Sequence, residues 1–214
     1  EVTRLSLKLE LLRDLPQVSA NSNFPVRTKL LSTGLNHSIR QGNALVSERR
    51  GDEMSVGMTK FYRRACFEAI GGYVHEVMWD AIDCHKARSL GWIAVSWDHP
   101  DLNFEHLRPM GSSQTSIWTG KRRHGFGQHF IGSDPLYYLA TCIFRMTERP
   151  YVLGGLAMLQ GYVAAWLGGK RRLDDRDLVA FIRDYQRRAL RMGKARAVAQ
   201  IEAERAPLFP GLQP

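Results

Sequence analysis

Residues 57–92 constrain the fold of this chain most, because they join a strand-like run, a glycine turn and a helix that begins with acidic side chains. Residues 57–62 predict a short strand, and the apolar residues of 67–70 predict a helical turn. The glycines at 71–72 permit backbone conformations that other residues avoid. Residues 79–90 then predict a helix, so the segment as a whole indicates a strand, a turn and a helix.

Two carboxylates stand in the first turn of that predicted helix. Asp80 and Asp83 are three residues apart and share a face. Unpaired amides and the helix dipole favour negative charge at this end. On the residue pattern alone, the two carboxylates either stabilise the start of the helix or lie at the mouth of a cleft, where one of them can act as a base.

The segment also carries a longer pattern of residues. It contains Tyr62, Arg63, Arg64, Phe67, Gly71 and Gly72, then Trp79 and Asp80, then Gly91 and Trp92. The pattern resembles the acceptor-side half of family 2 glycosyltransferases of the GT-A type, in a branch that serves bacterial polysaccharide synthesis. The resemblance extends over residues 30–191.

The resemblance implies an α/β fold, with a partial GT-A-like sheet followed by C-terminal helices. It implies a partial catalytic domain in residues 1–150 and a helical extension in residues 151–214 that can lie at a membrane interface. The implied activity is inverting transfer of a sugar from a nucleotide-sugar donor to a hydroxyl acceptor. Such a reaction needs a base, cationic help for the departing diphosphate and a site that aligns both substrates.

The resemblance also assigns roles to residues at the start of the predicted helix. It implies that Asp80 is the catalytic base and that Asp83 is a second catalytic carboxylate that orients the acceptor. Trp79 stands where the family usually has a glutamate, and we expect it to contact substrate. Arg63 follows the predicted strand and is a further substrate-binding candidate.

Residues 105–108 stand at the end of a second strand-like run, 102–106, which follows the strand predicted at 93–97. In enzymes that this chain resembles, a histidine here can bind the divalent metal, Mn or Mg, and an arginine can meet the diphosphate. The resemblance therefore implies His106 as a metal ligand and Arg108 as a substrate contact. A structural histidine held by hydrogen bonds is the alternative.

Residues 120–127 are basic and flanked by glycines, with Lys121, Arg122 and Arg123 in sequence. This composition predicts a mobile loop that closes over the nucleotide diphosphate, as the resemblance also implies. The segment matches neither a P-loop nor a dinucleotide-binding motif. A solvated surface loop is an equally compatible interpretation.

A D-x-D motif, which the resemblance leads us to expect ahead of the acidic residues, is missing there. The one literal match, 175–177, opens a polar helix and has no strand before it. We therefore expect the donor-binding half, and with it the divalent metal, to be missing from this chain, which is either a piece of a longer enzyme or a truncated homologue.

The charge of the chain favours anionic partners. It has a formal net charge of +9 and three widely spaced cysteines, which indicate reduced thiols in a cytosolic setting. Residues 152–168 are uncharged and precede a basic cluster at 169–172, which predicts a helix packed on the domain or lying in a membrane interface. Residues 174–204 predict one long charged helix whose apolar stripe docks on the domain.

We expect a nucleotide-sugar donor, a saccharide or lipid-linked acceptor, and a peripheral position at the inner face of the cell membrane. We expect no nucleic acid, because the chain lacks the usual nucleic-acid motifs. The alternative function is a non-catalytic basic module that binds anionic lipid or nucleic acid, or a scaffold.

Overall fold

A computed structural model of the chain describes residues 30–35, 37–41, 44–47, 54, 60–97, 104–106, 116–148, 150–205 and 208, with the backbone alone for residues 30–35, 37–41, 44–47, 97 and 104–106. The apolar spacing of residues 2–12 predicts a helix that Pro16 closes, and this segment lies outside the described residues.

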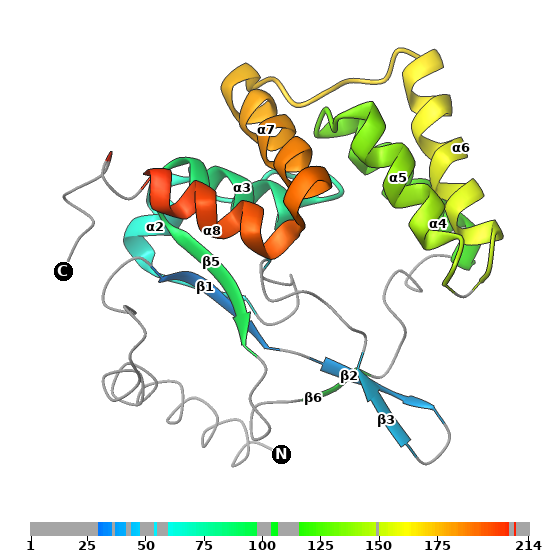
Figure 1. Cartoon of the computed structure of the whole chain (residues 1–214), viewed down its shortest axis with the longest axis horizontal. Coiled ribbons are helices and arrows are strands. Elements are labelled where there is room, and N and C mark those ends of the chain that lie inside the picture. The colour runs from blue at the N-terminus through cyan, green and yellow to red at the C-terminus, as the bar shows by residue number, and fades with distance from the viewer. Residues whose placement is uncertain are drawn as a thin grey trace.

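The described strands and helices run in the order shown in Figure 1. The strands are β1 (Leu30–Leu35), β2 (His37–Gln41), β3 (Ala44–Ser47), β4 (Phe61–Tyr62), β5 (Ile93–Trp97) and β6 (Phe104–His106). The helices are α2 (Arg64–Ala69), α3 (Trp79–Ser89), α4 (Ile117–Phe130), α5 (Pro135–Arg145), α6 (Leu153–Leu167), α7 (Arg176–Met192) and α8 (Lys194–Arg205).

The predicted α/β class, with a partial GT-A-like sheet, is wrong. Where side chains are described, 68% of the residues are helical and 5% lie in strands. The strands are only two to six residues long and form two separate three-stranded groups, β4-β1-β5 and β3-β2-β6. Apolar residues that recur at helical spacing dominate the second half of the chain, so the described core is built mainly by helices packing on helices.

The predicted positions of individual strands were more accurate than the predicted fold class. The strand predicted at 93–97 is β5, and β6 and β4 occupy the ends of the predicted runs 102–106 and 57–62. Strand β5 pairs in parallel with β1, and β4 pairs antiparallel with the other edge of β1. Strand β1 therefore lies between β4 and β5, and β5 is the strand that follows α3.

Helix α3 is the element around which the described core is arranged. It begins after Met78, whose left-handed backbone (φ 72°) reverses the chain, and it carries Asp80 in its first turn. Ile82 enters a core shared with α4, α7 and α8, whereas Cys84 and Ala87 enter a second core with α2 and β5. Helix α3 contacts α7, α8 and β5, and in Figure 1 α8 passes in front of α3 with α7 above and β5 below.

The long helix predicted over 174–204 is interrupted at Gly193. This residue has φ 86°, a left-handed conformation that glycine adopts without strain, and it separates α7 from α8. The predicted apolar stripe of α7 does dock on the domain, with Phe181, Ile182 and Tyr185 buried against the core that contains α3. Arg188 of α7 donates two hydrogen bonds to Glu204 of α8, so the two helices pack together.

The basic segment 120–127 is not a mobile loop, because it forms the middle of α4. The helix begins at Ser116, whose hydroxyl accepts a hydrogen bond from the Thr119 amide. Gly125 and Gly161 then let α4 and α6 approach backbone to backbone: a Cβ at Gly125 would lie 2.1 Å from the Met158 carbonyl oxygen. Because these two glycines have no side chain, α4 can pack closely against α6 as a helix.

Helices α5 and α6 form a pair with a small core of their own. Pro135 suits the first turn of a helix, so the sequence predicts a helix over 135–145, and α5 does begin at this residue. Asp134 caps α5 by accepting hydrogen bonds from the amides of Leu136 and Tyr137. Tyr138, Cys142 and Met158 are buried between the two helices. No described helix is both long enough and apolar enough to cross a membrane.

Candidate functional site

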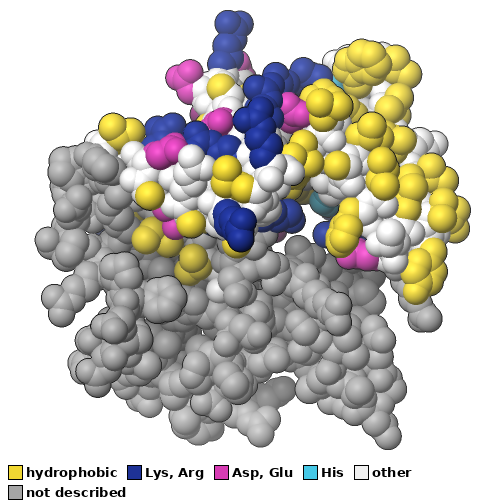
Figure 2. Space-filling view, viewed as in Figure 1, with side chains coloured by type: hydrophobic (Ala, Val, Ile, Leu, Met, Phe, Trp, Pro, Cys, Tyr) yellow, Lys and Arg dark blue, Asp and Glu magenta, His cyan; other side chains and the backbone are white. Residues whose placement is uncertain are grey.

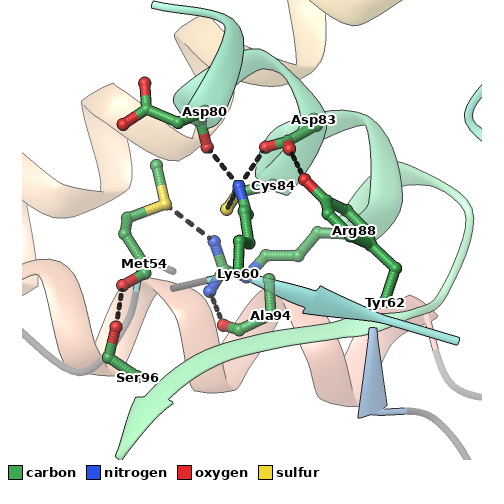
Figure 3. A network of polar contacts seen from close by, with 9 residues as sticks. All are labelled: Met54, Lys60, Tyr62, Asp80, Asp83, Cys84, Arg88, Ala94 and Ser96. Atoms are coloured by element: carbon green, nitrogen blue, oxygen red, sulfur yellow. Dashed lines mark hydrogen bonds and ion pairs between the residues drawn. The ribbon is translucent and has the colours of Figure 1, made fainter. Parts of the chain in front are cut away.

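The best-organised polar cluster of the described chain joins the residue before β4 to helix α3. Lys60 donates from its Nζ to Oδ1 of Asp83, and Tyr62 donates its hydroxyl to the other oxygen of the same carboxylate. The Lys60 ammonium also donates to the carbonyl oxygen of Asp80 at 2.8 Å and lies 3.3 Å from the sulfur of Cys84. Figure 3 shows the ammonium between these groups.

This cluster is closed to solvent. The side chains of Lys60 and Asp83 are 1% and 2% exposed. Burial raises the pKa of Asp83 despite the opposing effects of Lys60 and Tyr62. Burial and the hydrogen bond to Asp83 also raise the pKa of Tyr62, so its hydroxyl remains a donor. Both oxygens of Asp83 are therefore occupied from within the protein.

Asp80, one helical turn earlier, is placed differently. Its backbone carbonyl takes part in the cluster, whereas its carboxylate points away from Lys60 and Asp83 (Figure 3). The residue is partly exposed, and among the described residues its carboxylate has no ion-pair partner. Of the two predicted catalytic carboxylates, that of Asp83 is engaged on both oxygens, whereas that of Asp80 is partly exposed and forms no ion pair among the described residues.

A chain of aromatic rings lies beside these carboxylates. The rings of Tyr73 and Trp79 meet edge to face with centroids 4.8 Å apart, and Tyr73 also contacts Tyr62 and Phe67 edge to face. Tyr73 is 45% exposed. The Lys60 ammonium lies 5.7 Å from the centroid of the Trp79 ring, which ties the ring to the polar cluster. The result is a partly open aromatic surface next to Asp80.

A buried arginine holds α3 in place at its other end. Arg88 donates to the carbonyl oxygen of Ala94 in β5, contacts the sulfur of Met54, and pairs with Glu202 of α8 at 3.2 Å. Burial raises the pKa of Glu202, against the effect of the arginine. Helix α3 is thus anchored to β5 and α8, which fixes the direction in which its first turn points.

Two basic side chains surround Glu76, just before α3. Arg171 donates to the Glu76 carboxylate at 3.0 Å. The pKa of Glu76 is lowered by a hydrogen bond from the Val77 amide, by Arg171 and by the nearby charge of Arg123. Arg123 therefore lies near the segment that leads into α3, although on a helix and not on the predicted loop.

The other predicted site residues do not gather around Asp80 in the described structure. Arg63 is exposed at the start of α2, and Arg122 is exposed on α4. The Lys121 side chain lies beside Gly154 of α6. Arg108 and the side chain of His106 lie outside what the structure describes. A pocket between the end of α4 and the start of α7, lined by Arg172, Arg176 and Arg183, does not include Asp80.

Lys60 and Tyr73 are parts of the site that the sequence did not single out. Lys60 and Tyr62 are two residues apart, and this spacing places both side chains on one face of an extended segment. That spacing is the sequence feature from which their shared contact could have been predicted. Tyr73 follows the glycine turn, so its position depends on the path of that turn.

The described residues do not form a metal site. Among them, no three His, Cys, Asp or Glu side chains come together in a way that would hold a metal ion. The side chain of His106, the predicted metal ligand, lies outside the described residues.

No protein-family model, curated protein or solved structure matches this chain. The arrangement of its own residues is therefore the basis for a functional proposal.

Proposed function

We propose that this chain supplies the acceptor side and the catalytic base of an inverting glycosyltransferase that acts in cell-surface polysaccharide synthesis. The observation that carries the proposal is the contrast between two carboxylates in one helical turn. Asp83 is buried and held by Lys60 and Tyr62, while the Asp80 carboxylate is partly exposed, on the residue that follows Trp79 in α3.

The chemistry follows from this contrast. The Asp80 carboxylate takes the proton from the acceptor hydroxyl as its oxygen attacks the anomeric carbon of the donor sugar. The bond from that carbon to the nucleotide diphosphate breaks, and the diphosphate leaves with the bonding electrons. Asp80 acts here as the general base, in its carboxylate form.

The aromatic surface suits a saccharide acceptor. One face of a pyranose ring exposes C–H groups, which pack against an aromatic ring while the hydroxyls on its edge stay hydrogen-bonded. Trp79 directly precedes Asp80 at the start of α3 and meets Tyr73 edge to face, and we propose that a sugar bound against these rings brings a hydroxyl to the carboxylate. We propose Trp79 as an acceptor contact and assign Asp83 a positioning role in place of the predicted catalytic one.

The donor side of the reaction is carried over as a prediction. The nucleotide-sugar site, the divalent metal and the roles of His106 and Arg108 all concern residues outside those whose side chains are described. A peripheral position at the inner face of the cell membrane, with a saccharide or lipid-linked acceptor, forms part of the same proposal.

The alternative of a nucleic-acid-binding module receives less support. Three arginines of α7 are already engaged within the protein: Arg183 with the carbonyl of Gly132, Arg187 with Asp134, and Arg188 with Glu204. Guanidinium groups in internal contacts are not arranged as a stripe for a phosphate backbone.

The test combines binding with turnover. Saccharide binding to the chain is measured by calorimetry, and transfer from labelled nucleotide sugars to oligosaccharide acceptors is measured with the donor-binding half present. We expect Trp79→Ala to weaken acceptor binding, and Asp80→Asn to keep binding but lower transfer by about a hundredfold or more.

Two results would overturn parts of the proposal. Wild-type turnover in Asp80→Asn would reject the base, and absence of both binding and transfer would reject the function as a whole. Binding without transfer from any donor would reject catalysis by this chain and leave a saccharide-binding module.

A further inference from the structure

Helices α5 and α6 present an apolar surface that no described element covers. Figure 2 shows hydrophobic side chains gathered at the right of the molecule, where α5 and α6 lie in Figure 1. We define the α5–α6 apolar face by its most exposed large members on the two helices: Leu136, Ile143, Phe144, Leu153, Trp166 and Leu167. Leu136 and Leu167 are 71% and 74% exposed.

This face is distinct from the one that packs inside the protein. Helix α5 buries Tyr138 and Cys142, and α6 buries Met158 and Ala165. Both helices are therefore apolar on an inner side, which their own core requires, and again on an outer side. Single exposed apolar residues are ordinary, but a continuous group on two adjacent helices indicates a binding surface.

The charge around the face indicates what covers it. Residues 135–173 contain five basic side chains and one acidic one, Glu148, and that one pairs with Arg145. Lys170 and Arg171 are exposed just after α6. A second copy of the chain docked by the same face would bring these like charges together, whereas an anionic lipid surface would attract them.

The dimensions of the helices fit a surface position. Helix α6 has 15 residues, about 22 Å of helix, compared with about 30 Å for a hydrocarbon core. Trp166 near its end and Tyr151 just before its start are both about 60% exposed, and aromatic rings of this kind favour the depth of lipid headgroups. A helix that lies flat can place both rings at that depth.

We propose that the α5–α6 apolar face binds the surface of an anionic lipid bilayer, with both helices lying in the headgroup region and Lys170 contacting acidic lipids. This inference rests on the peripheral location in the proposed function and specifies the surface responsible. It assigns α5 an equal part in membrane contact and leaves α7 and α8, which share the core of α3, away from the bilayer.

The experiment measures sedimentation of the full chain with vesicles of two compositions. One is phosphatidylcholine alone, and the other is phosphatidylcholine mixed with an equal amount of phosphatidylglycerol. We expect binding to the mixed vesicles to exceed binding to phosphatidylcholine at least tenfold and to weaken as salt is added.

Variants then identify the surface. Ile143→Ser with Phe144→Ser, and separately Trp166→Ser with Leu167→Ser, should each lower binding at least tenfold, since each pair removes two buried apolar groups. Lys170→Gln should lower binding to the anionic vesicles about fivefold. Leu190→Ser is the matched control, because Leu190 is an exposed apolar residue on α7, and it should bind like the wild type.

Several outcomes would overturn the inference. Wild-type binding by both double variants would show that another surface meets the lipid, and no binding to either vesicle would reject lipid as the partner. Sedimentation of the wild-type chain as a dimer that either double variant converts to a monomer would identify a second copy as the occupant. Asp80→Asn should bind vesicles normally, so failure of the lipid surface and failure of the catalytic proposal are separately visible.

Discussion

Lys60 and Asp83 form an ion pair at 2.5 Å whose two side chains are almost completely removed from solvent. The pair joins the segment before β4 to the middle of α3, and Tyr62 completes it from the same side. Because α3 also carries Asp80, this internal contact sets the position of the one carboxylate that remains available for chemistry.

Breaking the pair on one side should destabilise the protein strongly. Asp83→Asn leaves the Lys60 charge buried without a counter-charge, and we expect a loss of about 3–5 kcal/mol in the free energy of unfolding. Urea denaturation followed by circular dichroism measures it. Replacing both partners with apolar residues, Lys60→Met with Asp83→Leu, should recover most of the loss.

The matched control for that experiment is the exposed pair of Arg64 and Glu68, whose side chains are 91% and 61% exposed. Arg64→Ala should change the free energy of unfolding by less than about 1 kcal/mol. An effect of Asp83→Asn no larger than this would show that the buried pair does not hold β4 to α3.

Asp80 and Asp83 should differ in what their loss affects. Asp80→Asn should abolish sugar transfer while changing stability by less than about 1 kcal/mol, the range expected for one charge at a helix start. Asp83→Asn should lower stability and activity together, because it acts through the position of α3. Measuring turnover and urea unfolding on both variants separates the roles, and equal stability losses would contradict the assignment.

Acid should destabilise the protein partly through His85. This residue is buried on α3 beside Tyr185 and Phe181, and its Nδ1 has no hydrogen-bond partner among the described residues. Burial, with Arg88 and Lys60 nearby, lowers the pKa of His85 to about 3.

The unfolded chain binds a proton at His85 below about pH 6.5, whereas the folded chain does not until about pH 3. Stability from this group is therefore present above pH 6.5 and falls as the pH is lowered, by about 1.4 kcal/mol per unit. Urea unfolding at a series of pH values should show a shallower acid loss in His85→Gln. An unchanged slope would show that His85 does not titrate in this way.

Any side chain added at Gly161 should destabilise the protein, because α4 and α6 are in close contact there. A Cβ there would lie 2.1 Å from the carbonyl oxygen of Arg122, which is backbone and cannot move alone. We expect Gly161→Ala to cost about 1–3 kcal/mol or more. On the same helix, a Cβ at Gly154 would have no neighbour closer than 3.7 Å.

Gly154→Ala is therefore the control, and it should be neutral or stabilise the helix by up to about 1 kcal/mol. Thermal unfolding of the two variants gives the comparison. Similar stabilities for both would show that α4 and α6 do not approach as closely as described.

Local elements were predictable wherever one residue pattern decided them. Pro135 after Asp134 set the start of α5, and the apolar stripe of 178–189 set the buried side of α7. The break at Gly193 was missed because a helical pattern continues on both sides of it, and only the left-handed backbone of that glycine separates the helices. The helix at 117–130 was missed because its glycines have low helical preference, which the contact of Gly125 with α6 overrides.

Residue patterns alone were enough to place a carboxylate pair in the first turn of the helix at 79–90, with a tryptophan beside it, and uncharged residues ahead of a basic cluster near 170. The packing of distant segments was needed to show that Lys60 and Tyr62 occupy Asp83 while the Asp80 carboxylate stays partly exposed, and that the strands are short beside a helical core. The physical reason is that helical periodicity and end preferences act within a few residues. Burial of a charge and the choice of its partner depend on segments brought together from distant parts of the chain.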